Sequence, residues 1–293
     1  MKHDPARWKA DYDRDGYLVV QDVLDQALLS DLRTAIEKIT RDPDNLPAQF
    51  KRRLDFERNY VQKRPQYNEL TAEQVGNAIR NVMELPLFDP IFAELICHAP
   101  RLDVLETCFE STEFSFHNYK AIIKAPRVSS KFRWHRDLPY LEHSTPNLIT
   151  AMLCLDEMTE ANGATVVLPG SHRISHEMVT ADDMDIPDDK LPANAPRVTV
   201  CCPAGSAVLF HVNIVHGGGA NRSDIPRRNV IGIWAGPNTY PITAARYVYQ
   251  DLMPRSADPA RQRQVRMTFP NRFGLGSAKQ VVDFAHDTQK GKN

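Results

Sequence analysis

The sequence predicts a mainly β chain with flanking α-helices, in which a double-sheet jelly roll or barrel lies behind N-terminal helices. Apolar residues recur at helical spacing only before about residue 100, whereas short β-rich runs separated by Pro, Gly and Asn fill the stretch from about 104 to 245. Evenly spaced short strands behind helices are typical of two packed sheets with helices outside one of them.

One domain over 1–293 is expected, because β-barrels and sandwiches of this length are often single units. Within it we predict a helical front at about 1–100, a jelly-roll core at about 104–245 and a C-terminal extension at 246–293.

The helical front is expected to hold one short strand and three helices. GYLVV at 16–20 is a β-like run, and after Asp25 the apolar residues recur at helical spacing. A second amphipathic helix is predicted after Thr71, with its apolar positions between 75 and 83. The proline-bracketed run at 86–100 predicts a third, short helix.

Residues 41–69 are rich in charge, Pro and Asn, which predicts a loop-like insertion with about one helical turn. Loops on a rigid scaffold commonly recognise substrates or close over them, so this insertion is the expected lid.

The core is predicted from β-rich runs bounded by turn residues. They are TEFSFHNYKAIIKAP, NLITAMLCLDEM, GATVVLPGS, RVTVCCPAGSAVLFH and RNVIGIWAGP.

Composition excludes several classes of protein. The 36 basic and 37 acidic residues are spread along the chain, so no nucleic-acid face or polybasic membrane anchor is expected. No apolar run approaches the ~18 residues of a membrane span, and the N-terminus lacks the apolar region of a signal peptide. We therefore expect a cytoplasmic protein whose partner is a small molecule. The five cysteines form no CxxC pair, which favours reduced and mostly buried thiols.

Three residues form the predicted metal site. His135 and Asp137 follow a strand-like segment, and residues two apart on an extended chain point to the same side. His216 ends an apolar run and precedes three glycines that allow a tight turn. Two imidazoles and one carboxylate on one face leave three positions open, which suits iron(II) with an oxo acid and dioxygen. Zinc takes the same ligands and is the rival metal.

A cationic side chain supports iron over zinc. Arg227 lies 11 residues past His216, where a turn followed by a strand would bring its guanidinium beside the metal. A fixed bidentate cation is what the distal carboxylate of an oxo acid requires, whereas a hydrolytic zinc site has no use for it.

These motifs resemble the phytanoyl-CoA dioxygenase family of iron(II)- and 2-oxoglutarate-dependent oxygenases. The resemblance is carried by DGYLVVQDVL near the start, HRD at 135–137, CLDEMTEANGATVVLPGSHR at 154–173 and HGGGANRSDIPRR at 216–228. It implies a double-stranded β-helix of cupin type, iron held by His135, Asp137 and His216, and 2-oxoglutarate gripped by Arg227.

The resemblance also implies an activity. An oxygenase of this family would use O2 to hydroxylate, desaturate or cyclise an unactivated carbon of a small metabolite, as tailoring enzymes of secondary metabolism do, with release of succinate and CO2. Asp137 argues against the family's halogenases, which replace this carboxylate by a small residue. Two alternatives stay open: a cupin-like isomerase or lyase without 2-oxoglutarate, and a non-catalytic jelly roll that binds a small molecule.

Further contacts are expected on neighbouring strands, and no catalytic residue is predicted beyond the metal centre. Lys120 and Thr150 are predicted to contact 2-oxoglutarate. The predicted substrate contacts are Asn118, Trp134 and Tyr140, with core packing as the alternative for the two aromatic residues. The basic side chains between 120 and 136 predict a solvated face, or else an anionic substrate; they are Lys120, Lys124, Arg127, Arg133 and Arg136.

Overall fold

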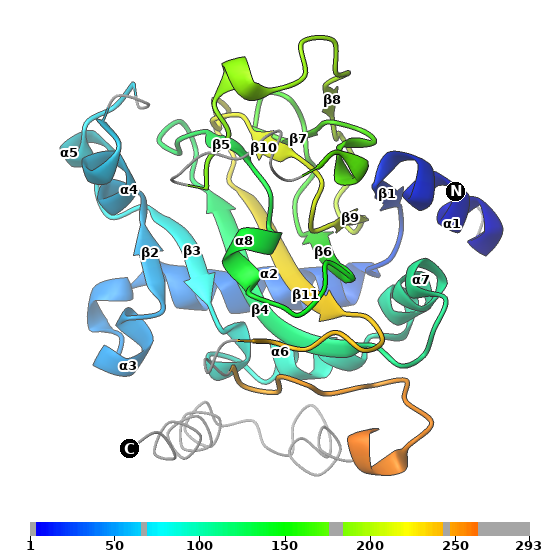
Figure 1. The fold of residues 1–293 in the computed structure, drawn as a ribbon. Helices are drawn as coiled ribbons and strands as arrows, with labels where there is room; N and C mark the ends of the chain where they lie inside the picture. The colour runs from blue at the N-terminus through cyan, green and yellow to red at the C-terminus, as the bar shows by residue number, and fades with distance from the viewer. Residues whose placement is uncertain (1–3, 66–68, 176–183, 243–246, 263–293) are drawn as a thin grey trace.

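Two antiparallel sheets form the centre of the computed structural model, which describes residues 4–65, 69–175, 184–242 and 247–262 (Figure 1). The large sheet has the strand order β1 (Tyr17–Val20), β9 (Ala207–His211), β6 (Leu148–Cys154), β11 (Arg227–Ala235), β4 (Ser115–Lys124), β3 (Ile79–Met83) and β2 (Leu54–Phe56). The small sheet has the order β5 (Phe132–His135), β10 (His216–Gly218), β7 (Thr165–Val167) and β8 (Val198–Thr199).

Helices cover the outer face of the large sheet, and α2 (Gln26–Arg41) runs across its back (Figure 1). This helix begins where Asp25 accepts a hydrogen bond from the Leu28 amide at 2.8 Å, and its apolar stripe is buried as its spacing predicts. The other helices are α1 (Pro5–Asp15), α3 (Ala48–Lys51), α4 (Glu57–Lys63), α5 (Ala72–Val75), α6 (Ile91–Glu94), α7 (Ala99–Phe109) and α8 (Leu138–Leu141).

Strand β6 separates two apolar cores. Its seven residues are all buried, which is why its sequence is a continuous apolar run rather than an alternating one. Ile149, Ala151 and Leu153 face the helices, whereas Met152 and Cys154 face the space between the sheets. The functional residues described below lie on this inner side.

Between residues 71 and 83 the predicted helix is wrong beyond its first turn. Thr71 and Gln74 form a reciprocal capping box that starts α5, but Gly76, with φ +57° and ψ −136°, ends it after one turn. The residues that follow form β3, which pairs with β4. The apolar spacing at 75–83 fits a helix and a short strand equally well, and strand pairing decides between them.

The segment 41–69 also has more structure than predicted. Besides two short helices it contains β2, which pairs with β3 at the edge of the large sheet. Helices α1 and α7 were not predicted, and α7 extends the helical front to Phe109. Strands β1, β2 and β3 of this front belong to the same sheet as the core strands, so front and core are not separate layers.

The strands expected in the core are present, and each of the five β-rich runs contains at least one of them. The described part of the C-terminal extension packs on this core: the Leu252 carbonyl accepts a hydrogen bond from Phe116 at 2.7 Å. Within the described ranges, no helix combines the length and apolarity needed to cross a bilayer.

Candidate metal centre

Three side chains meet on the inner face of the small sheet. His216 on β10 lies directly opposite His135 on β5, so strand pairing alone brings the two imidazoles together. Asp137 completes the group, with its Oδ1 3.9 Å from each Nε2. All three ligand atoms lie within 4.8 Å of one another, which is a spacing that one divalent ion can bridge.

Asp137 reaches this position by a different route from the predicted one. Strand β5 ends at His135, and Asp137 has helical backbone angles (φ −77°, ψ −31°) at the start of α8. Its amide donates to the Val212 carbonyl at 2.9 Å, which fixes the turn. The intervening Arg136 is buried, and its guanidinium donates to the Ser171 carbonyl at 3.2 Å. A turn, rather than an extended chain, therefore makes the two ligands converge.

Hydrogen bonds set the ring nitrogens for metal binding. His135 Nδ1 lies 2.7 Å from the Arg133 carbonyl and His216 Nδ1 lies 3.1 Å from the Ile214 carbonyl, so each Nδ1–H donates and each Nε2 is left with its lone pair. Burial, followed by the His216 ring, lowers the pKa of His135 to about 3, which keeps this imidazole neutral.

The carboxylate is held in its charged form. Burial alone would raise the pKa of Asp137, but His216, Lys120, His135 and the Thr150 hydroxyl together lower it. The Thr150 Oγ1 donates to Asp137 Oδ2 at 2.6 Å. The resulting neutral imidazole and ionised carboxylate match the ligand states that a divalent metal requires.

A cavity of about 100 Å³ adjoins the three ligands. The predicted co-substrate residues Arg227, Lys120 and Thr150 all line it, as do Met152 and the ligands themselves. Residues on or next to five strands, β4, β5, β6, β10 and β11, therefore meet at one site.

The three predicted substrate residues do not line this cavity. Trp134 packs against a small apolar cluster and stacks on Arg197 at 5.5 Å, so the core-packing alternative describes it better. Tyr140 is 52% exposed and presents its ring at 6.0 Å from that of His135. Asn118 lies further along β4 and contacts Tyr247.

Arg227, the first residue of β11, is buried with its guanidinium on the cavity. Burial lowers its pKa to about 10, so it stays charged at neutral pH. Its Nη1 touches the Met158 sulfur at 3.3 Å, whereas its buried Nε has no hydrogen-bond partner among the described residues. A buried donor without a partner is costly, and an anion in the cavity would satisfy it.

Lys124 is a cavity residue that sequence reasoning placed on a solvated face. It is 1% exposed and lies opposite Arg227 in the β4–β11 register. Its ammonium donates to the carbonyls of Ser130, at 3.2 Å, and Gly219. Burial, then the charge of Arg227, lowers its pKa well below the usual value. In the sequence, Lys124 alternates with Lys120 and Ile122, which is typical of residues on one face of a strand. Only the strand register, however, places Lys124 beside Arg227.

The predicted solvated face is therefore wrong for Lys124 and Arg136, which are both buried. It holds for Arg127, whose exposed side chain pairs with Asp224. Other cavity residues that the sequence did not single out are Asn81, Phe132, Thr165, Phe210, Asn229 and Ile231.

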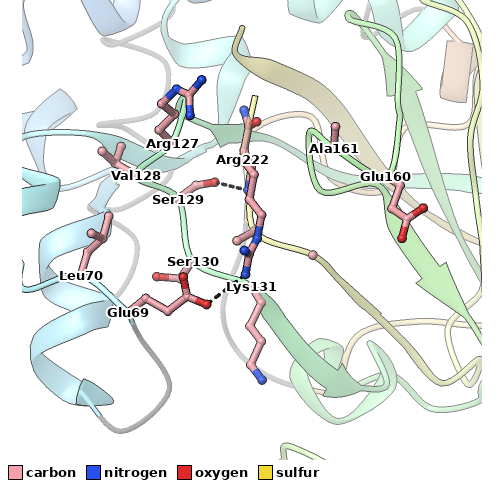
Figure 2. A pocket seen from close by; sticks show the side chains of 13 residues that line it. Glu69, Leu70, Arg127, Val128, Ser129, Ser130, Lys131, Glu160, Ala161 and Arg222 are labelled. Atoms are coloured by element: carbon pink, nitrogen blue, oxygen red, sulfur yellow. Dashed lines mark hydrogen bonds and ion pairs between the residues drawn. The ribbon is translucent and has the colours of Figure 1, made fainter. Parts of the chain in front are cut away.

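A larger hollow of about 830 Å³ lies elsewhere, between the loops at 127–131 and 219–222 (Figure 2). An ion pair between Arg222 and Glu69 at 3.0 Å crosses it. Ser130 and Gly219 line this hollow, and their carbonyls accept the hydrogen bonds of Lys124, which itself lines the metal cavity. None of the three metal-ligand candidates lines it.

Two histidines and one carboxylate within a jelly roll are typical of non-haem iron oxygenases. The family model for phytanoyl-CoA dioxygenase (PhyH) matches residues 12–229, and the chain belongs to this family.

Curated relatives and solved structures agree with this assignment. Ectoine dioxygenase of Sphingopyxis alaskensis is 28% identical over 78% of this chain and 75% of that protein. L-proline trans-4-hydroxylase of Streptomyces griseoviridis is 24% identical over 76% and 83%. The crystal structure of EctD from S. alaskensis with 2-oxoglutarate and 5-hydroxyectoine, 24% identical, superposes with a TM-score of 0.63 over 80% of this chain and 78% of that one. The predicted family, jelly-roll fold and dioxygenase class are thus confirmed.

Proposed function

We propose that this protein is an iron(II)- and 2-oxoglutarate-dependent dioxygenase that hydroxylates, desaturates or cyclises an unactivated carbon of a small metabolite. The observation that carries the proposal is the convergence of His135, Asp137 and His216 on a cavity that also holds the buried guanidinium of Arg227. The relatives named for ectoine and proline support a small-molecule substrate. The near-zero net charge of the chain agrees with a small-molecule partner. We further propose that the enzyme is cytoplasmic and forms a single domain over 1–293.

The residues present fit both iron(II) and 2-oxoglutarate. A face of two imidazoles and one carboxylate leaves three coordination positions open, as iron(II) with a bidentate oxo acid and dioxygen needs. The buried Nε of Arg227 has no hydrogen-bond partner among the described residues, and a carboxylate in the cavity would accept a hydrogen bond from it. A zinc hydrolase, or a cupin-like isomerase without an oxo acid, gives this donor no partner.

Each side chain then has a role. We assign the distal carboxylate of 2-oxoglutarate to Arg227 and Lys124, which lie opposite each other in the sheet. Lys120 supplies a further positive charge near the metal ligands, and Thr150, which also lines the cavity, orients the Asp137 carboxylate through its hydrogen bond. When bound, iron(II), 2-oxoglutarate and O2 supply the oxidation of the substrate carbon, with succinate and CO2 as by-products.

Apolar side chains form part of the cavity wall. Ile122, Phe210 and Ile231 line the cavity beside the polar groups. Burial strengthens charge interactions, so the Arg227 guanidinium acts more strongly there than it would in solvent.

Replacing Thr150 by Val should weaken metal binding. Valine has a similar shape but removes the hydrogen bond to Asp137, and losing such an outer partner typically costs about 10–100-fold in metal affinity. Anaerobic titration of the metal-free protein with iron(II) would measure the change.

Thr165→Val is the matched control, because Thr165 lines the same cavity but donates only to the Met152 sulfur at 3.9 Å. Equal iron affinities in the two variants would show that the Thr150 hydroxyl does not support the site.

Succinate release tests the whole proposal. Protein loaded with iron(II) without oxygen should give a visible charge-transfer band on addition of 2-oxoglutarate, and succinate when air and a substrate are supplied. A panel of small amino acids and cyclic metabolites would be screened for substrate-stimulated turnover. Iron binding without the band would favour the cupin-like isomerase or lyase, and the absence of both would leave a binding jelly roll.

A further inference from the structure

Two buried thiols face each other behind the metal cavity. Cys154 ends β6, and Cys202 lies in the segment between β8 and β9. Their sulfur atoms are 3.6 Å apart and share a hydrogen bond. Both cysteines are free, with exposed fractions of 0% and 4%. Nothing in the proposed reaction uses this pair.

The pair is connected to Arg227 through Met158. Cys202 and Met158 are joined by two backbone hydrogen bonds, from the Met158 amide at 2.9 Å and from the Cys202 amide at 3.1 Å. The Met158 sulfur touches the Arg227 Nη1 at 3.3 Å. A displacement of Cys202 is therefore passed directly to the residue that supports the guanidinium.

We propose that Cys154 and Cys202 are a site of reversible oxidation, in which a disulfide between them weakens the hold of Arg227 on 2-oxoglutarate. The thiol chemistry stands on the geometry of the pair, whereas the effect on 2-oxoglutarate rests on the proposed function. Hydrogen peroxide is the oxidant.

The chemistry balances as a two-electron oxidation. The Cys202 thiolate attacks peroxide, which breaks the O–O bond and gives a sulfenic acid and hydroxide. The Cys154 sulfur then displaces hydroxide from that sulfenic acid and forms the S–S bond, and the proton of its thiol leaves with the hydroxide as water. Two thiols and one peroxide thus become one disulfide and two waters.

Cys202 is the first sulfur to react. It is the less deeply buried of the two, and the hydrogen bond that it shares with Cys154 lowers its pKa, with the positive charge of Arg227 acting in the same direction. The same hydrogen bond raises the pKa of Cys154, which therefore stays protonated as the resolving thiol. A thiol of lowered pKa next to a resolving thiol is an arrangement that many oxidation-sensitive cysteines have.

Closing the bond requires movement in the loop with Cys202. A disulfide has a sulfur separation of about 2.05 Å, so the two atoms must approach by roughly 1.5 Å. Cys154 is held on both sides, since its amide donates to Ser206 at 2.9 Å and its carbonyl accepts from Gly205 at 2.8 Å. The displacement therefore falls partly on Cys202 and on Met158, which is paired with it.

The experiment separates the thiol chemistry from its effect. Metal-free protein would be treated with one equivalent of hydrogen peroxide, desalted and mapped by non-reducing peptide mass spectrometry. A Cys154–Cys202 linkage that dithiothreitol reverses is expected. After loading with iron(II) without oxygen, calorimetric titration with 2-oxoglutarate should show an affinity about tenfold lower than that of the reduced protein, as expected for loss of one charge-assisted hydrogen bond.

Two variants serve as a matched pair. Cys202→Ser should show no peroxide-dependent change in affinity, whereas Cys108→Ser, which removes a buried thiol that packs elsewhere in the helical core, should respond like the unmodified protein. If Cys202→Ser does not fold, Cys154→Ala replaces it.

Several results would overturn the proposal. The first is that both thiols remain reduced after peroxide treatment. The second is a disulfide through the exposed Cys201 instead of Cys202. The third is a Cys154–Cys202 disulfide that leaves the affinity for 2-oxoglutarate unchanged. If even the reduced protein binds no 2-oxoglutarate, the proposed function fails and the coupling with it, while the peptide map still decides the thiol chemistry.

Discussion

Asp137→Asn is expected to abolish iron binding at micromolar metal and to reduce succinate formation to background. The amide keeps the size of the side chain but removes the only carboxylate among the three ligand candidates. Changes to outer partners of a metal ligand already cost about 10–100-fold in affinity, so loss of a ligand charge should exceed the upper end of that range. Anaerobic iron titration and the succinate assay would measure the two effects.

Asp224→Asn is the control for this variant. Asp224 is an acidic side chain that pairs with Arg127, is 77% exposed and does not line the metal cavity. Its loss should leave iron affinity unchanged, since exposed ion pairs contribute little. If circular dichroism shows that both variants are folded and Asp137→Asn binds iron as tightly as the unmodified protein, Asp137 is not a metal ligand.

The ligand set could be predicted from sequence because it is encoded in short motifs. His135 and Asp137 lie two residues apart, and His216 is marked by the glycines that follow it. The pairing of His135 with His216 across the sheet could not be predicted from sequence, because the register depends on how two strands pair. The turn at Asp137 was hidden for a similar reason: it depends on a hydrogen bond to Val212 in a distant loop.

The errors share one physical cause, which is that local patterns do not record what a side chain packs against. The spacing of apolar residues before Met83 fits a helix until pairing with β4 imposes a strand. Lys124 and Arg136 look like surface charges in sequence, yet distant backbone carbonyls accept their hydrogen bonds and allow their burial. Trp134 is adjacent to a metal ligand and points to the other side of its strand, into a small core.

Arg227→Met should raise the dissociation constant for 2-oxoglutarate by about 100-fold or more. Methionine fills a comparable volume without charge, and hydrogen bonds to charged groups contribute about 1.5–3 kcal/mol each, so two of them account for a change of this size. Burial strengthens the effect, because water cannot replace the guanidinium in the cavity. Iron affinity should stay the same, since Arg227 is not a metal-ligand candidate, and calorimetry without oxygen would measure both constants.

Arg228→Met provides a control one residue away. Successive side chains of a strand point to opposite faces, and the Arg228 guanidinium pairs with Asp156 at 2.8 Å and Glu37 at 2.7 Å, outside the cavity. Its loss should lower the melting temperature but leave the affinity for 2-oxoglutarate unchanged. Both variants remove one positive charge from the same strand. A difference in their affinities for 2-oxoglutarate therefore reflects which guanidinium faces the cavity. Equal affinities in Arg227→Met and the unmodified protein would place the oxo acid elsewhere and leave the buried Nε without an explanation.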